Sequence, residues 1–190
     1  NYSFLHKASK SVDRMIELVD DLAAISRLES GEIAMEMSTF DIRKLVEDVY
    51  DSVEYLSKEK EATCSFRQSA DVIFHVVADR KRIEQVLTNL VVNALKYGKN
   101  GGKVSCGIYD MDENILVEIS DDGEGIPSNA LPRVFERFYR VEQSRTRDAG
   151  GSGLGLSIVK HIVEAHAQTI TVRSKEGEGT TFGFTLQKAD

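Results

Sequence analysis

The sequence predicts an α/β fold: a two-layer α/β sandwich in which helices cover one face of a single mixed, mostly antiparallel sheet. Two observations lead to this prediction. Amphipathic helical patterns alternate along most of the chain with pairs of adjacent strand patterns. Adjacent strand pairs favour antiparallel hairpins, and the helices between them must then cover one face of the same sheet. A longer helical pattern precedes this region.

The long N-terminal helix is expected over residues 2–28, where apolar residues recur at steps of three and four with charged residues between them. It should end at residues 30–31, because glycine readily adopts the left-handed conformation of a helix C-cap. We therefore expect a helical segment at residues 1–31, a linker at 32–38 and a compact domain at 39–190. The apolar positions of the helix are Leu5, Val12, Met15, Val19, Leu22, Ile25 and Leu28.

The compact domain is expected to alternate helices with strand pairs. Thr39 and Asp41 are both candidate N-caps of its first helix. The last two strands flank a glycine-containing turn at residues 177–179 and are predicted to form a hairpin. The predicted helices cover residues 42–56, 80–97 and 154–166. The predicted strands cover residues 63–68, 72–78, 104–109, 115–120, 170–174 and 181–186.

Composition limits the classes of partner. The chain has 190 residues and a formal net charge of −7, so much of its surface would repel nucleic acid and anionic membranes. Cys64 and Cys106 form neither a CxxC motif nor a cluster with histidines, which argues against a disulfide framework or a zinc site and favours a reducing cytosol. No apolar run reaches the roughly 18 residues of a membrane-spanning helix. Any phosphate site must therefore be built locally.

Three polar side chains are expected on one face of the helix at residues 80–97. Asn89 and Asn93 are four residues apart and Lys96 follows three later, so they share a stripe. Amide oxygens suit a Mg²⁺ ion that already carries phosphate oxygens, and an ammonium group neutralises remaining phosphate charge. Taken alone, the stripe is more typical of a solvated polar face.

Residues 121–127, Asp-Asp-Gly-Glu-Gly-Ile-Pro, directly follow a predicted strand. Asp121 could accept a hydrogen bond there from an exocyclic amine such as that of adenine. Gly123 and Gly125 would let the backbone approach a flat ligand closely. An ordinary acidic turn explains the same residues. An EF-hand calcium loop does not, because the alternating ligands and the closing glutamate are missing.

A glycine-rich segment at residues 150–156 leads into the last predicted helix, where free amides and the helix dipole could hold phosphate oxygens. It matches neither a Walker A motif nor GxGxxG, so a P-loop enzyme and a Rossmann dehydrogenase fit poorly. The basic and aromatic residues at 134–147 suggest a lid over phosphates, with a charged surface helix as the alternative. Arg140 and Arg145 are the functional candidates in this stretch, whereas Phe135 is expected in the core.

The order and spacing of these motifs resemble the GHKL ATPase superfamily and, within it, the sensor histidine kinases. The resemblance covers nearly the whole chain and implies a Bergerat-type ATP-binding fold. It matches the asparagine box to residues 89–97, the first and second glycine boxes to 121–126 and 151–156, the phenylalanine box to 135–140, and the third glycine box to 177–182.

The resemblance implies that the cofactors are ATP and Mg²⁺. Asn93 would be the main Mg²⁺ ligand and Asn89 a second or water-bridged one. Lys96 and Arg140 would contact phosphates, and Asp121 would read the adenine. The residues that the resemblance places around the nucleotide are Asn89, Asn93, Lys96, Tyr97, Asp121, Gly123, Gly125, Ile126, Phe138, Tyr139, Arg140, Arg145, Gly151, Gly153, Leu154, Gly155, Leu156 and Thr180.

Two departures and one junction refine the resemblance. Other branches of the resembled superfamily, such as DNA gyrase, MutL and chaperone ATPases, have a glutamate base at the position of Asn89. The resemblance therefore implies that ATP is kept for transfer rather than hydrolysis. Residues 18–31 resemble the end of the dimerisation and phosphotransfer hairpin, so residues 1–31 are expected to be its second helix. No histidine matches the phosphoacceptor motif, since His6 is followed by lysine rather than an acid. Residues 167–168, Ala-Gln, replace a turn that is usually glycine-rich.

We therefore expect the catalytic domain of a histidine protein kinase. It would bind Mg-ATP and donate the γ-phosphate to a histidine of its own dimerisation domain, for relay to the receiver domain of a response regulator. The parent is expected to be a homodimeric, membrane-anchored bacterial sensor whose cytosolic portion includes this chain, with no nucleic-acid or membrane contact by this part. The chain alone is not expected to phosphorylate itself. An ATP-binding regulatory module without kinase activity, or a dimeric scaffold, is the alternative.

Overall fold

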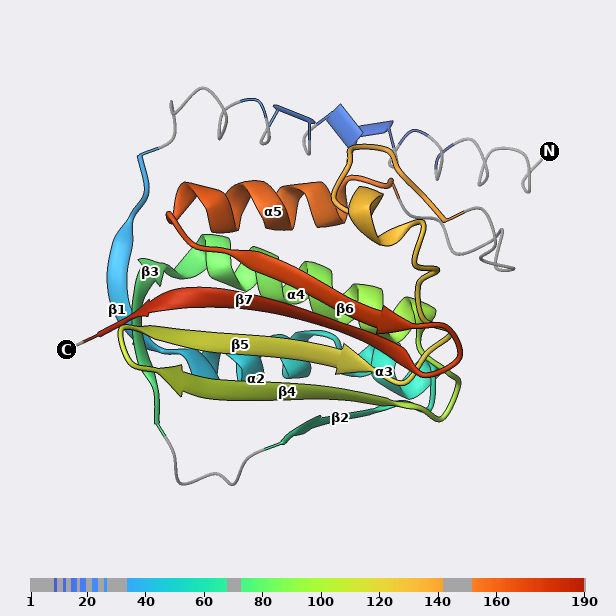
Figure 1. The fold of residues 1–190 in the computed structure, drawn as a ribbon, viewed down its shortest axis with the longest axis horizontal. Helices are drawn as coiled ribbons and strands as arrows, with labels where there is room; N and C mark the ends of the chain where they lie inside the picture. The colour runs from blue at the N-terminus through green and yellow to red at the C-terminus, as the bar shows by residue number, and fades with distance from the viewer. Residues whose placement is uncertain are drawn as a thin grey trace.

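The computed structural model describes residues 34–67, 73–141 and 152–189, together with nine positions between Ser9 and Ser26. Helices α2, α4 and α5 cover one face of a sheet (Figure 1). The elements of the continuous part are β1 (Met37–Asp41), α2 (Ile42–Ser52), α3 (Glu54–Glu59), β2 (Thr63–Phe66), β3 (His75–Asp79), α4 (Arg80–Tyr97), β4 (Lys103–Met111), β5 (Asn114–Asp121), the short 3-10 helix η1 (Leu131–Arg133), α5 (Gly155–Ala165), β6 (Ile170–Lys175) and β7 (Gly179–Lys188).

The sheet has the strand order β1-β3-β7-β5-β4-β2, and β6 pairs with β7 beside this path. Among the described strands, β2 and β4 form the one parallel pair, while the remaining pairs are antiparallel. Strands joined by short turns pair as hairpins, and the intervening helices fold back onto one face. The structure thus confirms the predicted two-layer sandwich with its mixed, mostly antiparallel sheet.

The first helix of the compact domain begins one residue after Asp41, whose Oδ1 accepts hydrogen bonds from the amides of Arg43 (2.9 Å) and Lys44 (3.4 Å). Of the two candidate caps, Asp41 is confirmed and Thr39 is wrong, because Thr39 lies in β1 and pairs with Val77. The sequence did not predict β1, since its mostly exposed and polar residues show little apolar alternation.

Two further predicted elements differ most from the structure in their bounds, while most of the others differ by one or two residues. The helix predicted over residues 42–56 is interrupted at Val53, which separates α2 from α3. The strand predicted over residues 72–78 begins at His75 and extends to Asp79, where α4 starts. The predicted bounds of α4 agree with the structure, because an apolar stripe marks the whole helix and Asp79 caps its first turn.

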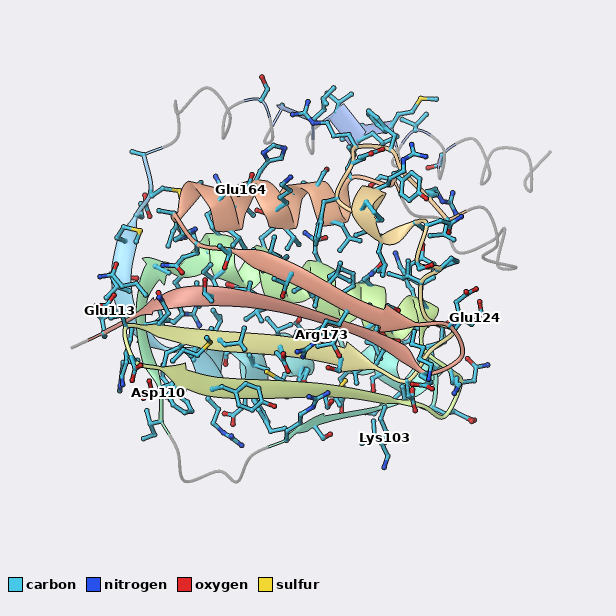
Figure 2. The ribbon with its side chains drawn as sticks, viewed as in Figure 1. Lys103, Asp110, Glu113, Glu124, Glu164 and Arg173 are labelled. Carbon is cyan, nitrogen blue, oxygen red and sulfur yellow. The ribbon has the colours of Figure 1, made fainter. Side chains whose placement is uncertain are left out.

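The core lies between the sheet and the helices. Leu87 and Leu90 of α4 are fully buried, as are Ile162 of α5 and Phe184 of β7. On the opposite face of the sheet, Glu118 of β5 forms ion pairs with Arg67 (3.5 Å) and with Arg173, which is labelled in Figure 2. One face of the sheet is therefore apolar and packed, while the other carries charged pairs.

The predicted N-terminal helix lies mostly outside the described residues. The nine described positions have helical backbone. Leu18 is partly buried and packs against the core, whereas Val19 is 66% exposed. None of the helices in the described part of the chain is both long and apolar enough to span a membrane. The nine positions are Ser9, Val12, Met15, Ile16, Leu18, Val19, Leu22, Ala23 and Ser26.

Candidate nucleotide-binding site

The predicted site residues come from segments that meet at one end of the sandwich. Helix α4 ends there, α5 begins there, and β5 ends beside the turn that joins β6 to β7 (Figure 1). Each segment arrives with its polar or glycine-rich residues at that end. The sheet and the antiparallel helices α4 and α5 therefore gather motifs that are far apart in sequence.

The asparagine stripe lies along the side of α4, next to the start of α5. Asn89, Asn93 and Lys96 are half-buried, in contrast to the fully buried apolar stripe of the same helix. A Cβ atom added to Gly155, the first residue of α5, would lie 3.2 Å from Asn89 Oδ1. Asn89 thus lies against the second glycine segment, with its amide oxygen close to the first residue of α5.

Asp121 stands at the end of β5, where its Oδ1 accepts a hydrogen bond from the amide of Gly123 at 2.8 Å. Burial raises the pKa of this carboxyl, while hydrogen bonds from the backbone of Gly123 and Thr180 oppose the rise. A carboxylate has lone pairs for more than these bonds. Asp121 can therefore accept a further hydrogen bond from an amine while its orientation is fixed.

The backbone of two other segments passes close to the first glycine segment. A Cβ added to Gly123 would lie 2.3 Å from the carbonyl oxygen of Tyr97, at the end of α4. Gly125 has φ +74°, and a Cβ there would lie 2.2 Å from the carbonyl oxygen of Lys175. Since real Cβ atoms are excluded at such distances, glycine is required at both positions.

The β6–β7 turn is bonded to this segment. Gly177 donates its amide hydrogen to the carbonyl of Glu124 at 2.7 Å. Ser174 Oγ accepts from the amide of Ile126 at 2.8 Å and donates to the carbonyl of Gly179 at 2.8 Å. Sequence reasoning missed Ser174; the one signal was its position on the inward-facing side of an alternating strand.

Thr180, which the resemblance places near the nucleotide, is buried beside this turn. Its Oγ1 lies 2.9 Å from Ser174 Oγ, and the backbone of Thr180 bonds to Asp121. Gly179 has φ +121°, and a Cβ there would lie 2.1 Å from the carbonyl oxygen of Asp121. The third glycine box therefore packs directly on the residue predicted to read the adenine.

The phenylalanine box divides into a core residue and an exposed one. Phe135 packs edge-to-face on Phe182, with ring centroids 6.1 Å apart, as expected for a core residue. Phe138 has φ +62° and a side chain that is 60% exposed, and its amide donates to the carbonyl of Gly153 at 2.9 Å. This bond joins the two ends of the intervening segment. Of the predicted site residues, Arg145 and Gly151 lie outside the described residues.

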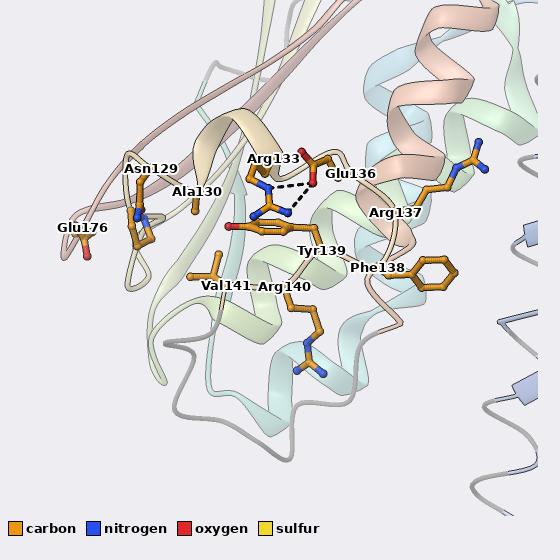
Figure 3. A pocket seen from close by; sticks show the side chains of 11 residues that line it. Asn129, Ala130, Arg133, Glu136, Arg137, Phe138, Tyr139, Arg140, Val141 and Glu176 are labelled. Carbon is orange, nitrogen blue, oxygen red and sulfur yellow. Dashed lines mark hydrogen bonds and ion pairs between the residues drawn. The ribbon is translucent and has the colours of Figure 1, made fainter.

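A pocket of about 840 Å³ opens beside the phenylalanine box (Figure 3). Tyr139 and Arg140 line it, while the side chains of Arg137 and Phe138 point to the other side, away from Tyr139. Arg133 pairs with Glu136 at 3.0 Å and lies over the Tyr139 ring, 4.4 Å from its centroid. Sequence reasoning missed Arg133 and Glu136. The residues of the α4 stripe and Asp121 do not line this pocket, and the Phe138–Gly153 bond links the phenylalanine box to the segment that leads into α5.

Comparison with known proteins identifies the family of the chain. The family of histidine kinase-, DNA gyrase B- and HSP90-like ATPases matches residues 78–190. The chain belongs to this family. It is 38% identical to the sensor histidine kinase WalK of Bacillus subtilis over 185 residues, which are 96% of this chain and 30% of that protein. It is 34% identical to WalK of Staphylococcus epidermidis over 189 residues, 97% of this chain and 30% of the relative.

Solved structures of histidine kinases are also similar to this chain. The catalytic domain of the histidine kinase ThkA matches with a TM-score of 0.70 and 30% identity, over 81% of this chain and 97% of that one. Full-length ShkA in complex with AMPPNP matches with a TM-score of 0.83 and 26% identity, over 98% of this chain and 39% of that one. ThkA in complex with the response regulator TrrA matches with a TM-score of 0.75 and 26% identity, over 95% of this chain and 49% of that one.

The chain is therefore the ATP-binding catalytic domain of a sensor histidine kinase, and it spans about 30% of the length of its WalK relatives. In the described part of this kinase domain, no three histidine, cysteine, aspartate or glutamate side chains are grouped so as to hold a metal ion. The amide oxygens of Asn89 and Asn93 remain as donors. This sparse donor set suits Mg²⁺, which keeps waters and takes phosphate oxygens as ligands.

Proposed function

We propose that this kinase domain binds Mg-ATP and donates the γ-phosphate to a histidine on the dimerisation domain of the same kinase. The supporting observation is the convergence of the boxes at one end of the sandwich. Asn89 lies against Gly155, the end of α4 lies against Gly123, and Asp121 lies against Gly179. These contacts hold a hydrogen-bond acceptor, amide ligands and backbone amides around one region.

Each group has a distinct task in this proposal. Asp121 accepts a hydrogen bond from the adenine amine. Lys96 and Arg140 neutralise phosphate charge, together with Arg145. Mg²⁺, held by Asn93 and Asn89, supplies charge neutralisation of the phosphate oxygens when it is bound. The remaining proposed contacts are Tyr97, Gly123, Gly125, Ile126, Phe138, Tyr139, Gly151, Gly153, Leu154, Gly155, Leu156 and Thr180.

Transfer rather than hydrolysis follows from the chemistry of Asn89. A neutral amide does not take a proton from water at physiological pH, so Asn89 cannot act as a general base. Positioning and charge neutralisation then favour attack by a nucleophile delivered from outside this domain. A histidine held in line with the γ-phosphate meets that requirement.

The rest of the kinase is also part of the proposal. Residues 1–31 form the second helix of the dimerisation domain, residues 32–38 the linker, whose last two residues already belong to β1, and residues 39–190 the catalytic domain. The exposed apolar side chains on the described helical positions, Met15 and Val19 among them, would face partner helices in a homodimer. The recipient of the phosphoryl group is a response regulator, as the ThkA–TrrA complex supports. The WalK similarity supports a membrane-anchored sensor whose cytosolic portion includes this chain.

The test is phosphotransfer in trans. The chain is incubated with Mg²⁺ and γ-labelled ATP, alone and with a separately supplied dimerisation hairpin that carries its phosphoacceptor histidine. We expect acid-labile label on the hairpin and none on this chain, and an Asn93→Ala variant should lose the transfer. ATP binding without label on the hairpin would instead identify a regulatory module, and acid-labile label on the isolated chain would contradict the assignment of the acceptor.

A further inference from the structure

Asp79 lies at the start of α4, the end of the helix that is far from Lys96, and it bonds to three segments of the chain. Its side chain is almost fully buried, with 6% of the residue exposed. Oδ1 accepts from the amide of Arg82 at 3.1 Å and so caps α4. Oδ2 accepts from the amide of Glu36, also at 3.1 Å. The backbone amide of Asp79 donates to His166 Nε2 at 3.0 Å.

His166 extends this set of bonds to α5. Because Nε2 accepts a hydrogen bond, the ring proton is on Nδ1, which donates to the carbonyl of Ile162 at 2.8 Å. His166 is also the C-cap residue of α5. The start of α4 and the end of α5 are therefore bonded to the same residue, Asp79.

The position of these bonds matters because α4 and α5 run from Asp79 to the nucleotide site. Helix α4 has 18 residues and is about 27 Å long. Its polar stripe lies against the start of α5 at Asn89 and Gly155. Residues 34–36 enter the domain from the N-terminal side and continue into β1, beside β3 and the left-hand ends of both helices (Figure 1).

A helix cap alone does not account for this arrangement. Asp41 caps α2 with one oxygen, Oδ1, which accepts from two first-turn amides. Asp79 uses one oxygen for the cap and the other for Glu36, which is 43 residues away in sequence. The second bond holds the incoming segment, and the cap does not require it.

We propose that Asp79 is a positioning residue that couples residues 34–36 to α4 and α5. Through it, the segment that arrives from the dimerisation helix would keep a fixed relation to the helices that hold the nucleotide. This inference rests on the proposed function, since the coupling matters when the phosphoacceptor and the nucleotide are on linked domains. The bonds of Asp79 described above lie at the far end of α4 from the nucleotide residues, so its effect on the reaction would be indirect.

The first test measures the bond itself, independently of activity. Asparagine caps helices as well as aspartate does, so Asp79→Asn should keep the cap and turn its NH₂ group toward the Glu36 amide. We expect hydrogen exchange of the Glu36 amide to become about tenfold faster or more in this variant, because losing a charge-assisted bond lowers its protection. The matched control is Asp41→Asn, which should leave that rate unchanged.

The second test separates coupling from catalysis. We would measure autophosphorylation with the chain joined to a complete dimerisation hairpin, and transfer in trans to a separate hairpin. Asp79→Asn should slow the linked reaction about tenfold through misplacement of the linked domains, with the KM for ATP and the trans rate unchanged. Glu36→Pro, which removes the amide donor, should act likewise, whereas Glu36→Ala, which keeps it, should not.

The outcomes distinguish the two proposals. Equal linked rates in wild type, Asp79→Asn and Glu36→Pro would overturn the coupling while leaving the kinase function intact. Parallel loss of the linked rate, the trans rate and ATP affinity would show that Asp79 supports the fold only, and this also contradicts the inference. Absence of transfer by the wild type in both formats would overturn the proposed function, and the exchange experiment would still report on the bond.

Discussion

Opposing effects act on the carboxyl of Asp121, the proposed acceptor for the adenine amine. Burial raises the pKa of its carboxyl, while two backbone hydrogen bonds favour the ionised form. The position of Asp121 at a strand end was readable from the sequence, and so was the neighbouring Gly123. The bond from the backbone of Thr180 was not, because it depends on how β5 and β7 pair.

The raised pKa of Asp121 predicts a pH dependence of nucleotide affinity. Because its folded-state pKa lies above the ordinary 3.8, the folded protein holds the proton of Asp121 more tightly than the unfolded chain does. Ionisation of Asp121 therefore reduces the stability of the fold as pH rises from 3.8 through the folded-state pKa. An amine of the ligand favours the ionised acceptor. Affinity for an ATP analogue should therefore weaken as pH falls through the folded pKa. Calorimetry across acidic pH checks this, and an equally steep decline in Asp121→Asn would exclude Asp121 as the cause.

Cys106 gives a prediction about accessibility. It is fully buried, and burial raises the pKa of its thiol to about 12. A neutral, buried thiol reacts with disulfide reagents only after the surrounding structure opens. In a Cys64→Ser variant, labelling of Cys106 should be slow and should accelerate with denaturant. If that variant were labelled as fast as Cys64 is in Cys106→Ala, the burial of Cys106 would be contradicted.

At the scale of secondary-structure elements, the periodicity of apolar residues predicted the elements whose apolar side chains pack in the core. Helix α4 was predicted with its observed bounds, because the apolar stripe that signals it is the stripe buried in the core. Strand β1 was missed, because it is a mostly exposed edge strand and is held by pairing with β3. Such pairing is a property of the assembled sheet, and the five residues alone carry little sign of it.

The β6–β7 turn provides a matched pair of glycines. Gly177 has φ +80°, and an added Cβ would meet no atom of the described residues within 4 Å, whereas a Cβ on Gly179 would meet Asp121. Gly177→Ala should destabilise the domain by about 1–2 kcal/mol through backbone strain alone. Gly179→Ala adds a clash and should cost about 3 kcal/mol or more, with loss of ATP-analogue binding. Urea unfolding compares the two; equal costs would contradict the contact between this turn and Asp121.

At the scale of the whole molecule, helices α4 and α5 connect two ends with different roles. The residues proposed to bind the nucleotide gather at one end, and the Asp79 bonds lie at the other. Through resemblance, the motif order assigned residues to a nucleotide site, and that assignment stays a prediction. It did not predict that Ser174 would join the glycine boxes or that Arg133 would lie over Tyr139, because these contacts depend on tertiary packing.

Ligand binding should stabilise the entire fold. A ligand that binds only the folded state at a hundredfold excess over Kd adds about 2.7 kcal/mol of stability. A non-hydrolysable ATP analogue with Mg²⁺ should therefore raise the Tm of this domain, and chelation by EDTA should remove most of the increase. Thermal unfolding with and without EDTA checks this. An identical Tm increase in EDTA would contradict the proposed Mg²⁺ ligands on α4.

The central claim is that Asp121 belongs to an ATP site, and calorimetric titration of a non-hydrolysable ATP analogue with Mg²⁺ tests it most directly. Asp122→Asn is the control, because Asp122 Oδ1 accepts from the amide of Lys103 at 3.0 Å and asparagine keeps that oxygen. The account predicts binding by wild type and Asp122→Asn, and about 10- to 100-fold weaker binding by Asp121→Asn, the range expected for a lost hydrogen bond to a charged group. Wild-type affinity in Asp121→Asn, or no binding by the wild type, would contradict it.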